Sequence, residues 1–457
     1  VDENGEWEVV LKSMKAGGPF EMLIEANNKI LLKNILIGDV WICSGQSNMA
    51  WKVRNSKNAS TEISNANYDN IRLLKVPNQM SNVPLKSLPQ VAWNITTPDN
   101  IPDFSAVGYF FGREIHKELN VPIGLIQSAW GGTCVETWTS KEFITKVPNY
   151  ENMGERIDEF DVAQKEQDKK DELINLIGKF PTQELGYTDN WMQPSFDKSN
   201  WRTMTLPNYW ENLGYENLDG ILWFSYEFEL NNKVTDNQNA YLNLGKIDDN
   251  DITWVNGQKV GQTNNKSENR KYKLDSQILK SGINHITIRV QDFWGKGGFG
   301  ANKSDFYLEI EEKTIPLHGK WKFKADFVRD KFLPSPNEVP SLLYNSMIHP
   351  LLRFPIKGTI WYQGENNARR AKEYAVTFPN MINNWRANWG QGDFPFLFVQ
   401  LANFRNPKPT PSNDNWAELR ESQTKTLKLE NTAMAVAIDL GEANNIHPKN
   451  KQDVGKR

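Results

Sequence analysis

Hydrophobic residues follow two alternating patterns along this chain. In the first, short apolar runs typical of buried strands end in small polar turns, and amphipathic segments separate several of them. One such segment, a helix expected at 107–119, carries Val107, Phe111, Ile115 and Leu119 at a spacing of four residues. This pattern predicts an α/β fold class, a parallel sheet with helices on its faces. The strands are expected at 35–42, 121–126, 358–362, 394–401 and 433–438.

The second pattern, alternation of apolar and polar residues, fills the middle of the chain. Between 188 and 325 it recurs in short segments separated by turn signals such as Asn256-Gly257, which predicts an all-β sandwich. Because α/β segments flank it, we expect the sandwich to be inserted into one domain made of 39–150 and 326–457. A charged helical connector is expected at 151–187. The remnant of an N-terminal β module, with strands at 7–11 and 20–25, is expected at 1–38. After the turn at Ser47 we expect a polar, asparagine-rich segment up to residue 82 and then loops to about residue 102.

The composition excludes several classes of partner. A net charge of −3 gives no electrostatic basis for binding nucleic acid or an anionic membrane. No apolar run reaches the ~20 residues of a membrane span.

The counts of particular residue types indicate further properties. The 17 tryptophans either stack on sugar rings or fill sheet cores. Cys43 and Cys134 make no disulfide framework, and we expect free buried thiols. No cluster has the spacing of metal ligands, so neither a metal nor another cofactor is expected.

Residues suited to acyl transfer follow the expected strands of the α/β domain. Ser47 comes after the first strand, where a hydroxyl beside backbone N–H groups is a common nucleophile. Gly131 and Gly132 after the second strand offer backbone N–H groups to an oxyanion. Gln363 or Asn366, after the third, offers a side-chain amide for the same purpose.

A general base would come from the five histidines of the chain. His116 and His285 fall within a helix and a strand pattern, which indicates structural roles. His318 and His349 lie in connecting segments, where His349 is a weak competitor. His447 lies beyond the last strand of the sheet and is the expected base.

Four ordered blocks of sequence carry a resemblance to a known family. They are SGQSNM at 44–49, WGGT at 130–133, WYQGENN at 361–367 and IHPKNK at 446–451. Together they resemble the sialate O-acetylesterase family of carbohydrate acetylesterases, within the SGNH (GDSL-like) hydrolase superfamily. The resemblance spans nearly the whole chain and implies a three-layer α/β/α sheet. Residues 219–223, 244–249 and 255–261 resemble the galactose-binding-like jelly roll of family 2 glycoside hydrolases, which implies a scaffold or a glycan-binding module.

The resemblance implies a role for each block. Ser47 would be the nucleophile and His447 the general base, and the N–H groups of Ser47 and Gly132 would form part of the oxyanion hole. The third block departs from the superfamily's Gly-x-Asn, because relatives of this subgroup more often keep Gln-Gly-Glu there. We therefore expect Gln363 to be the additional donor, with Asn366 as second choice.

The acid of a catalytic triad is the weakest part of the resemblance. The superfamily places Asp three residues before the histidine, and some relatives place it two before, where this chain has Asn444 and Asn445. Either the Ser–His pair works unaided, or Asp439 or Glu442 supplies the carboxylate. Losing this carboxylate costs a serine protease a factor of about 10⁴ in rate.

These features predict a carbohydrate O-acetylesterase that releases acetate through a serine acyl-enzyme, similar to a sialate 9-O-acetylesterase or to a plant-polysaccharide acetylesterase. The alternative is a carbohydrate-binding protein with a degenerate esterase site. A lipase-like esterase is disfavoured by the polar, tryptophan-rich loops. The expected partner is an acetylated carbohydrate, and bacterial relatives imply a periplasmic or extracellular location for a secreted protein.

Overall fold

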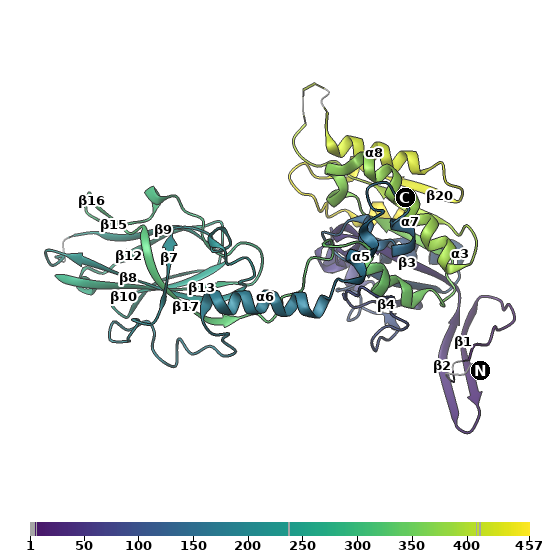
Figure 1. The fold of residues 1–457 in the computed structure, drawn as a ribbon, viewed down its shortest axis with the longest axis horizontal. Coiled ribbons are helices and arrows are strands. Elements are labelled where there is room, and N and C mark those ends of the chain that lie inside the picture. Colours follow the sequence, from purple (N-terminus) through teal and green to yellow (C-terminus); the bar gives the residue numbers. More distant parts are fainter. Residues whose placement is uncertain (1–4, 6, 236–237, 408, 411–412) are drawn as a thin grey trace. The chain divides into compact units, whose positions relative to one another are not determined.

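The computed structural model describes residues 5, 7–235, 238–407, 409–410 and 413–457. The chain forms two compact units, one made of Val1–Val162 with Ser335–Arg457 and the other of Ala163–Pro334. The colours of Figure 1 show that the first unit combines the two ends of the chain and the second contains its middle. The division at Ala163 and Pro334 separates compact units and does not test the sandwich boundaries expected at 188 and 325, which stay predictions.

In the described part of the first unit, seven strands form one sheet in the order β20-β19-β18-β3-β6-β4-β5. All neighbours are parallel except β4 and β5. The predicted α/β fold class with a parallel sheet is therefore confirmed. The strands are β3 (Asp39–Gly45), β4 (Tyr68–Lys75), β5 (Asn94–Thr96), β6 (Ile123–Ala129), β18 (Gly358–Tyr362), β19 (Phe396–Gln400) and β20 (Thr432–Val436).

Helices cover both faces of this sheet. Trp41 on β3 packs edge-on against Phe111 of α3 (Ala106–Leu119), with ring centroids 4.9 Å apart. Trp361 of β18 is in register with Ser44 and so faces the other side, where it stacks on Phe378 of α7 (Ala371–Trp389). Helix α9 (Lys451–Lys456) packs against α3, and α8 (Asn415–Thr426) packs against α7. The result is a three-layer α/β/α arrangement.

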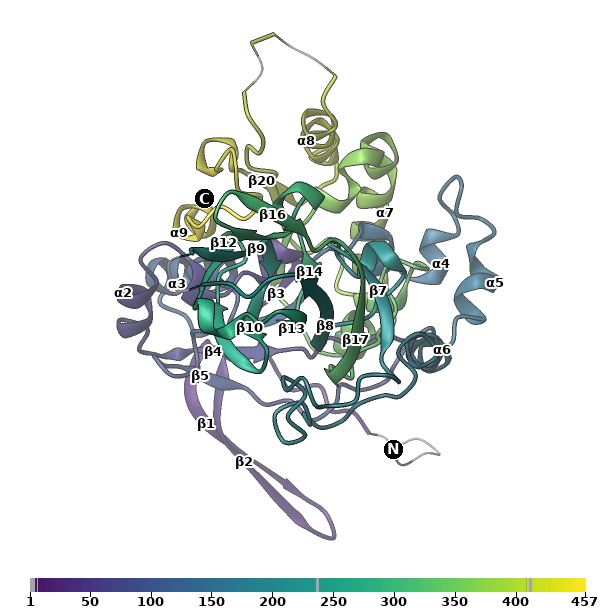
Figure 2. The same cartoon turned by 90° about the vertical axis from the view of Figure 1, so that its left-hand side faces the viewer.

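The N-terminal part of the first unit differs from the sequence prediction in detail. Strands β1 (Gly17–Glu25) and β2 (Lys29–Ile37) form an antiparallel hairpin, drawn in purple in Figure 2, whereas 7–11 forms no strand. The prediction of loops from residue 82 to about 102 was wrong at β5, and the segment expected to be polar up to residue 82 contains strand β4. The remaining α-helices described in this unit are α1 (Ser47–Ala50), α2 (Ala59–Ser64), α4 (Lys141–Ile144) and α5 (Met153–Asp158).

The second unit begins within the long helix α6 (Val162–Ile177) and continues as a β-sandwich. Its sheets have the orders β11-β10-β13-β8-β17-β7 and β12-β9-β15-β16, with β14 paired to β9, and every pairing is antiparallel. Alternate residues such as Leu222, Phe224 and Phe228 on β8 are buried in the core, as predicted from the period of two. The strands are β7 (Arg202–Leu206), β8 (Gly220–Leu230), β9 (Ala240–Asp248), β10 (Asn250–Val255), β11 (Gln258–Thr263), β12 (Asn269–Leu274), β13 (Gly282–Asp292), β14 (Gly298–Phe299), β15 (Tyr307–Ile310), β16 (Lys313–Pro316) and β17 (Gly319–Val328).

Candidate active site

Ser47 stands where the central strand β3 turns into the short helix α1. Gly45 has a φ of +133°, and a Cβ there would lie 2.2 Å from the Tyr362 carbonyl oxygen, so only glycine fits this turn. The Gln46 N–H donates to the same carbonyl at 3.0 Å. Ser47 is therefore the first residue of a helix that starts at the carboxyl end of the sheet, half-buried between the ends of β6 and β18.

His447 reaches Ser47 from the loop between β20 and α9. Its Nε2 lies 2.8 Å from Ser47 Oγ, within hydrogen-bond reach. The imidazole stacks on Trp51, with ring centroids 5.2 Å apart and an angle of 18° between the planes. The His447 backbone N–H donates to Asn445 Oδ1 at 3.0 Å, which fixes the loop just before the ring. This is the geometry of a nucleophile paired with a general base.

The residues considered for the triad acid are engaged elsewhere. Glu442 accepts hydrogen bonds from Asn445 Nδ2 at 3.0 Å and from the Lys449 N–H at 2.9 Å. Asp439 pairs with Arg457 at 2.6 and 2.7 Å. Within the described part of the chain, no residue forms a hydrogen bond with His447 Nδ1. The structure thus brings Ser47 and His447 together, while Glu442, Asp439 and Asn445 form their hydrogen bonds with groups other than the imidazole.

The turn after β6 lies directly beside the nucleophile. A Cβ on Gly131 would be 3.3 Å from Ser47 Cβ, so the absent side chain lets the backbone approach the serine closely. Gly132 has a φ of +74°, and its carbonyl accepts from Asn337 Nδ2 and Asn366 Nδ2, both at 2.8 Å. Among the described residues, nothing accepts a hydrogen bond from the N–H groups of Ser47 and Gly132. Both are free to donate to an oxyanion.

The two side-chain amides expected at the oxyanion lie in different surroundings. Gln363 is fully buried, and its Nε2 donates to the Thr133 carbonyl at 3.1 Å and to Asn367 Oδ1 at 2.6 Å. Gln363 therefore holds the residue that follows Gly131 and Gly132 in place through its bond to the Thr133 carbonyl. Asn366 is exposed, and its Nδ2 donates to Gly132 and to Cys134 Sγ at 3.0 Å. Both N–H groups of each amide are thus engaged by other acceptors, and both amides bond to the Gly132–Cys134 turn.

Three polar residues, Asn48, Glu365 and Lys451, are joined by hydrogen bonds next to the Ser–His pair. Asn48 Nδ2 donates to Glu365 Oε1 at 2.5 Å and to the Ile446 carbonyl at 3.0 Å, and Asn48 Oδ1 accepts from Lys451 Nζ at 2.5 Å. Asn48 thereby ties helix α1 to the residue that precedes His447. Sequence analysis missed these roles, although all three residues fall within or beside the quoted blocks.

Burial shapes the charge of the groups around the site. Lys451 is fully buried, and this burial lowers the pKa of its amine to about 7. Burial likewise raises the pKa of Glu365. The pKa of His447 is lowered, first by burial and then by the positive charge of Lys451. The imidazole is therefore neutral at pH 7, the form that accepts a proton from a serine.

Two further findings concern the rest of the chain. Cys43 and Cys134 are free and buried, as expected. None of the helices in the described part of the chain combines the length and the apolarity that crossing a membrane requires.

The fold and the strand-end arrangement define the class: a three-layer α/β/α domain with a serine and a histidine in contact at the carboxyl end of its sheet, together with a β-sandwich. The family model "Carbohydrate esterase, sialic acid-specific acetylesterase" matches residues 37–170 and 333–456, more than half of the chain. The chain belongs to this family.

Relatives support this assignment over nearly the whole chain. It is 26% identical to a mouse sialate O-acetylesterase, covering 100% of this chain and 62% of the relative, and 25% identical to the human protein of that name, covering 99% and 58%. It is similar in structure to a carbohydrate acetylesterase from Xanthomonas citri, with a TM-score of 0.56, 26% identity, and coverage of 99% of this chain and 62% of the other. The chain thus spans about 60% of the length of the curated relatives it matches.

Proposed function

We propose that this protein is a carbohydrate O-acetylesterase in which Ser47 is the nucleophile and His447 the general base. The observation that carries the proposal is the 2.8 Å contact between Ser47 Oγ and His447 Nε2 at the carboxyl end of the sheet. The family and the relatives named above support the acetyl ester of a carbohydrate as the class of substrate.

The reaction proceeds in two acyl transfers. Ser47 Oγ attacks the acetyl carbonyl carbon while His447 Nε2 takes the hydroxyl proton, and the N–H groups of Ser47 and Gly132 donate to the oxyanion that forms. His447 then gives the proton to the departing sugar oxygen, which leaves an acetyl ester on Ser47. A water molecule, deprotonated by His447, attacks this ester and releases acetate, and the proton returns to Ser47.

Among the residues that the structure describes, no carboxylate bonds to His447 Nδ1, and other contacts orient the imidazole. The Trp51 ring stacks on its face, and the Asn445 side chain holds its backbone. An aromatic face attracts a cation by ~0.5–2 kcal/mol, so Trp51 also favours the imidazolium formed during attack. This contribution is smaller than that of a buried carboxylate. We therefore propose a Ser–His dyad that Trp51 supports.

No metal is needed for this chemistry. In the described residues, the acidic cluster with metal-ligand spacing lies in the sandwich, and it includes neither Ser47 nor His447. The Ser–His pair alone supplies the nucleophile and the proton transfer.

The test is acetate release from p-nitrophenyl acetate and from acetylated glycans by the full chain and by two serine variants. Ser47→Ala is expected to lose at least ~10³-fold in kcat/KM, because it removes the nucleophile. Ser44→Ala is the matched control, since Ser44 Oγ is buried three residues earlier on β3 and has no hydrogen-bond partner. Turnover that persists in Ser47→Ala, or glycan binding without turnover by the unmodified chain, would overturn the proposal.

A further inference from the structure

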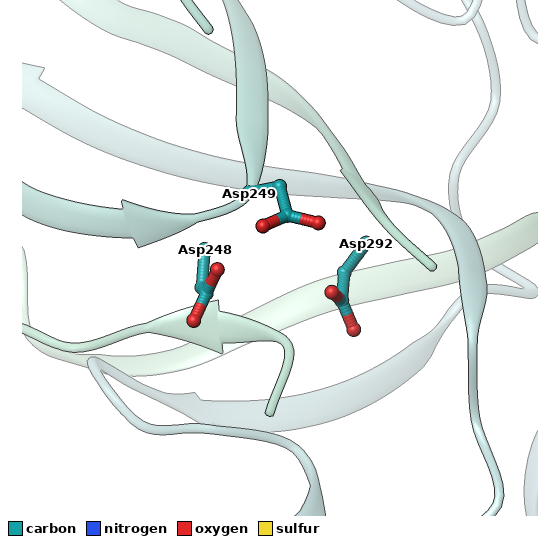
Figure 3. Close-up of side chains that lie close together, drawn as sticks. All are labelled: Asp248, Asp249 and Asp292. Carbon is teal, nitrogen blue, oxygen red and sulfur yellow. The ribbon is translucent and has the colours of Figure 1, made fainter. Parts of the chain in front are cut away.

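Three carboxylates meet at one end of the β-sandwich, in the second unit. Asp248 ends β9, Asp249 follows it in the turn to β10, and Asp292 ends β13. The pairing of Asn250 with Gln291 brings the turn and the end of β13 side by side. One oxygen of each carboxylate lies within 4.8 Å of the others. Figure 3 shows the three side chains facing a common space between the strands.

Asp292 is a buried group with an unused oxygen. Its side chain is 0% exposed, and its Oδ1 accepts a hydrogen bond from the Trp294 N–H at 3.2 Å. In the part of the chain that the structure describes, neither Asp292 Oδ2 nor Asp248 Oδ1 has a hydrogen-bond partner, and both atoms are buried. A buried carboxylate oxygen that receives no hydrogen bond is costly, so these atoms indicate a ligand that faces them.

The positive side chains nearby do not neutralise the cluster. Lys266 Nζ lies 3.7 Å from Asp248 Oδ1, and its side chain is 60% exposed, which makes it a weak, solvated partner. Arg270 is committed to Asp251 through a 2.8 Å bond from its Nε. Arg270 Nη2 also donates to the Asp249 backbone carbonyl at 3.1 Å, and not to the Asp249 carboxylate.

The charge balance around the cluster is consequently acidic. Burial raises the pKa of Asp292 to about 7 and that of Asp248 to about 6, and the negative charge of Asp249 adds to the rise at Asp292. These directions agree with a site that lacks a compensating cation.

We propose that Asp248, Asp249 and Asp292 bind a divalent metal ion, and that this ion is Ca²⁺. The site offers only oxygen ligands, which hard cations prefer, and it has three carboxylates to balance the charge. Ca²⁺ accepts irregular arrangements of six to eight oxygens and takes water at open positions, whereas Mg²⁺ demands a near-ideal octahedron. The ion would join the β9–β10 turn to the end of β13, and so stabilise this end of the sandwich.

The experiment uses the purified full chain after treatment with EDTA. Calorimetric titration with CaCl₂ measures affinity and stoichiometry, and Tb³⁺ luminescence excited through tryptophan reports on the same site. We expect one ion per chain, weaker binding of Mg²⁺, and at least a tenfold loss of affinity in Asp292→Asn and in Asp248→Asn. Asp305→Asn, which changes an exposed aspartate of the same unit, is the matched control and is expected to bind like the unmodified chain.

A thermal scan in EDTA separates loss of the site from loss of the fold. Asp292→Asn removes one of three mutually repelling charges, so its transition in EDTA is expected at or above that of the unmodified chain, while the rise on adding Ca²⁺ disappears. The proposal is overturned if the unmodified chain shows no saturable binding up to ~10 mM Ca²⁺, the weak end of known protein sites being about 1 mM. It is also overturned if Asp248→Asn and Asp292→Asn bind as tightly as the control.

Discussion

Asn48 offers the most direct test of how the Ser–His pair is held together. Its carboxamide contacts three groups that are distant in sequence: Glu365, the Ile446 carbonyl and Lys451. Asn48 is buried, so water cannot replace its hydrogen bonds when the side chain is shortened. Asn48→Ala would remove all three hydrogen bonds and leave a buried ammonium and a buried carboxyl group without this partner.

The size of the effect follows from the kinds of bond that are lost. A hydrogen bond to a charged group contributes roughly 1.5–3 kcal/mol and a neutral one about 1 kcal/mol, so the three bonds sum to ~4–7 kcal/mol. Neighbouring bonds are not additive, and we expect a loss of about 4 kcal/mol in the free energy of unfolding of the first unit. This corresponds to a thermal transition lowered by about 8 °C for a domain of this size.

Calorimetry and kinetics together test this expectation. The variant should also lose at least ~10-fold in kcat with little change in KM, because the loop that carries His447 loses its tie to helix α1. Asn444→Ala is the control, since Asn444 is exposed in the same loop and has no hydrogen bond to a described residue. Its stability should change by less than ~0.5 kcal/mol. If Asn48→Ala matched this control in both measurements, the proposed linkage would be refuted.

Two further predictions concern the base. The kcat/KM should fall as the pH drops through the lowered pKa of His447, because the imidazole must be neutral to accept the serine proton. Lys451→Met should move this acid limb of the pH profile to higher pH, because it removes a positive charge that repels the imidazolium. An unmoved acid limb would contradict the electrostatic role of Lys451. Glu442→Gln should lower kcat by less than ~10-fold, since Glu442 anchors the loop through Asn445 and Lys449, whereas a loss near ~10⁴ would identify Glu442 as a triad acid.

The sequence predicted the sheet well where strands are fully buried. The strand expected at 358–362 is β18 with the same bounds, because a continuous apolar run is enclosed by polar turns. The segment 35–42 was expected to be one strand, yet the chain breaks at Gly38, where a Cβ would lie 2.0 Å from the Pro122 carbonyl oxygen. Strand β4 was missed because Asp69, Arg72 and Lys75 interrupt its apolar residues. Strand β4 is the second strand from the edge of the sheet, and its outer neighbour is the short edge strand β5.

The candidate site was predictable where a motif names the residue. Ser47 and His447 were identified from their blocks, and Ser47 Oγ lies 2.8 Å from His447 Nε2 in the structure. The hydrogen bond between Lys451 and Asn48, beside the Ser–His pair, was not predictable. A lysine is almost never fully buried, and Lys451 lies 403 positions from Asn48 in the sequence. The environment of Gln363 was likewise beyond the sequence. Whether its amide faces a ligand or the Thr133 carbonyl depends on how one turn packs beneath another.

The interrupted first unit has a consequence for how the protein is made. Ser47 precedes His447 by 400 residues, and the central strand β3 gains its neighbour β18 only after the sandwich has been synthesised. Strand β18 begins 313 residues after β3 ends (358 − 45), so at about 5–20 residues per second the ribosome needs roughly 15–60 s to reach it. During this time one edge of a strongly hydrophobic strand has no partner. Such an edge can pair with another chain, so a chaperone that shields nascent strands should raise the yield of this protein.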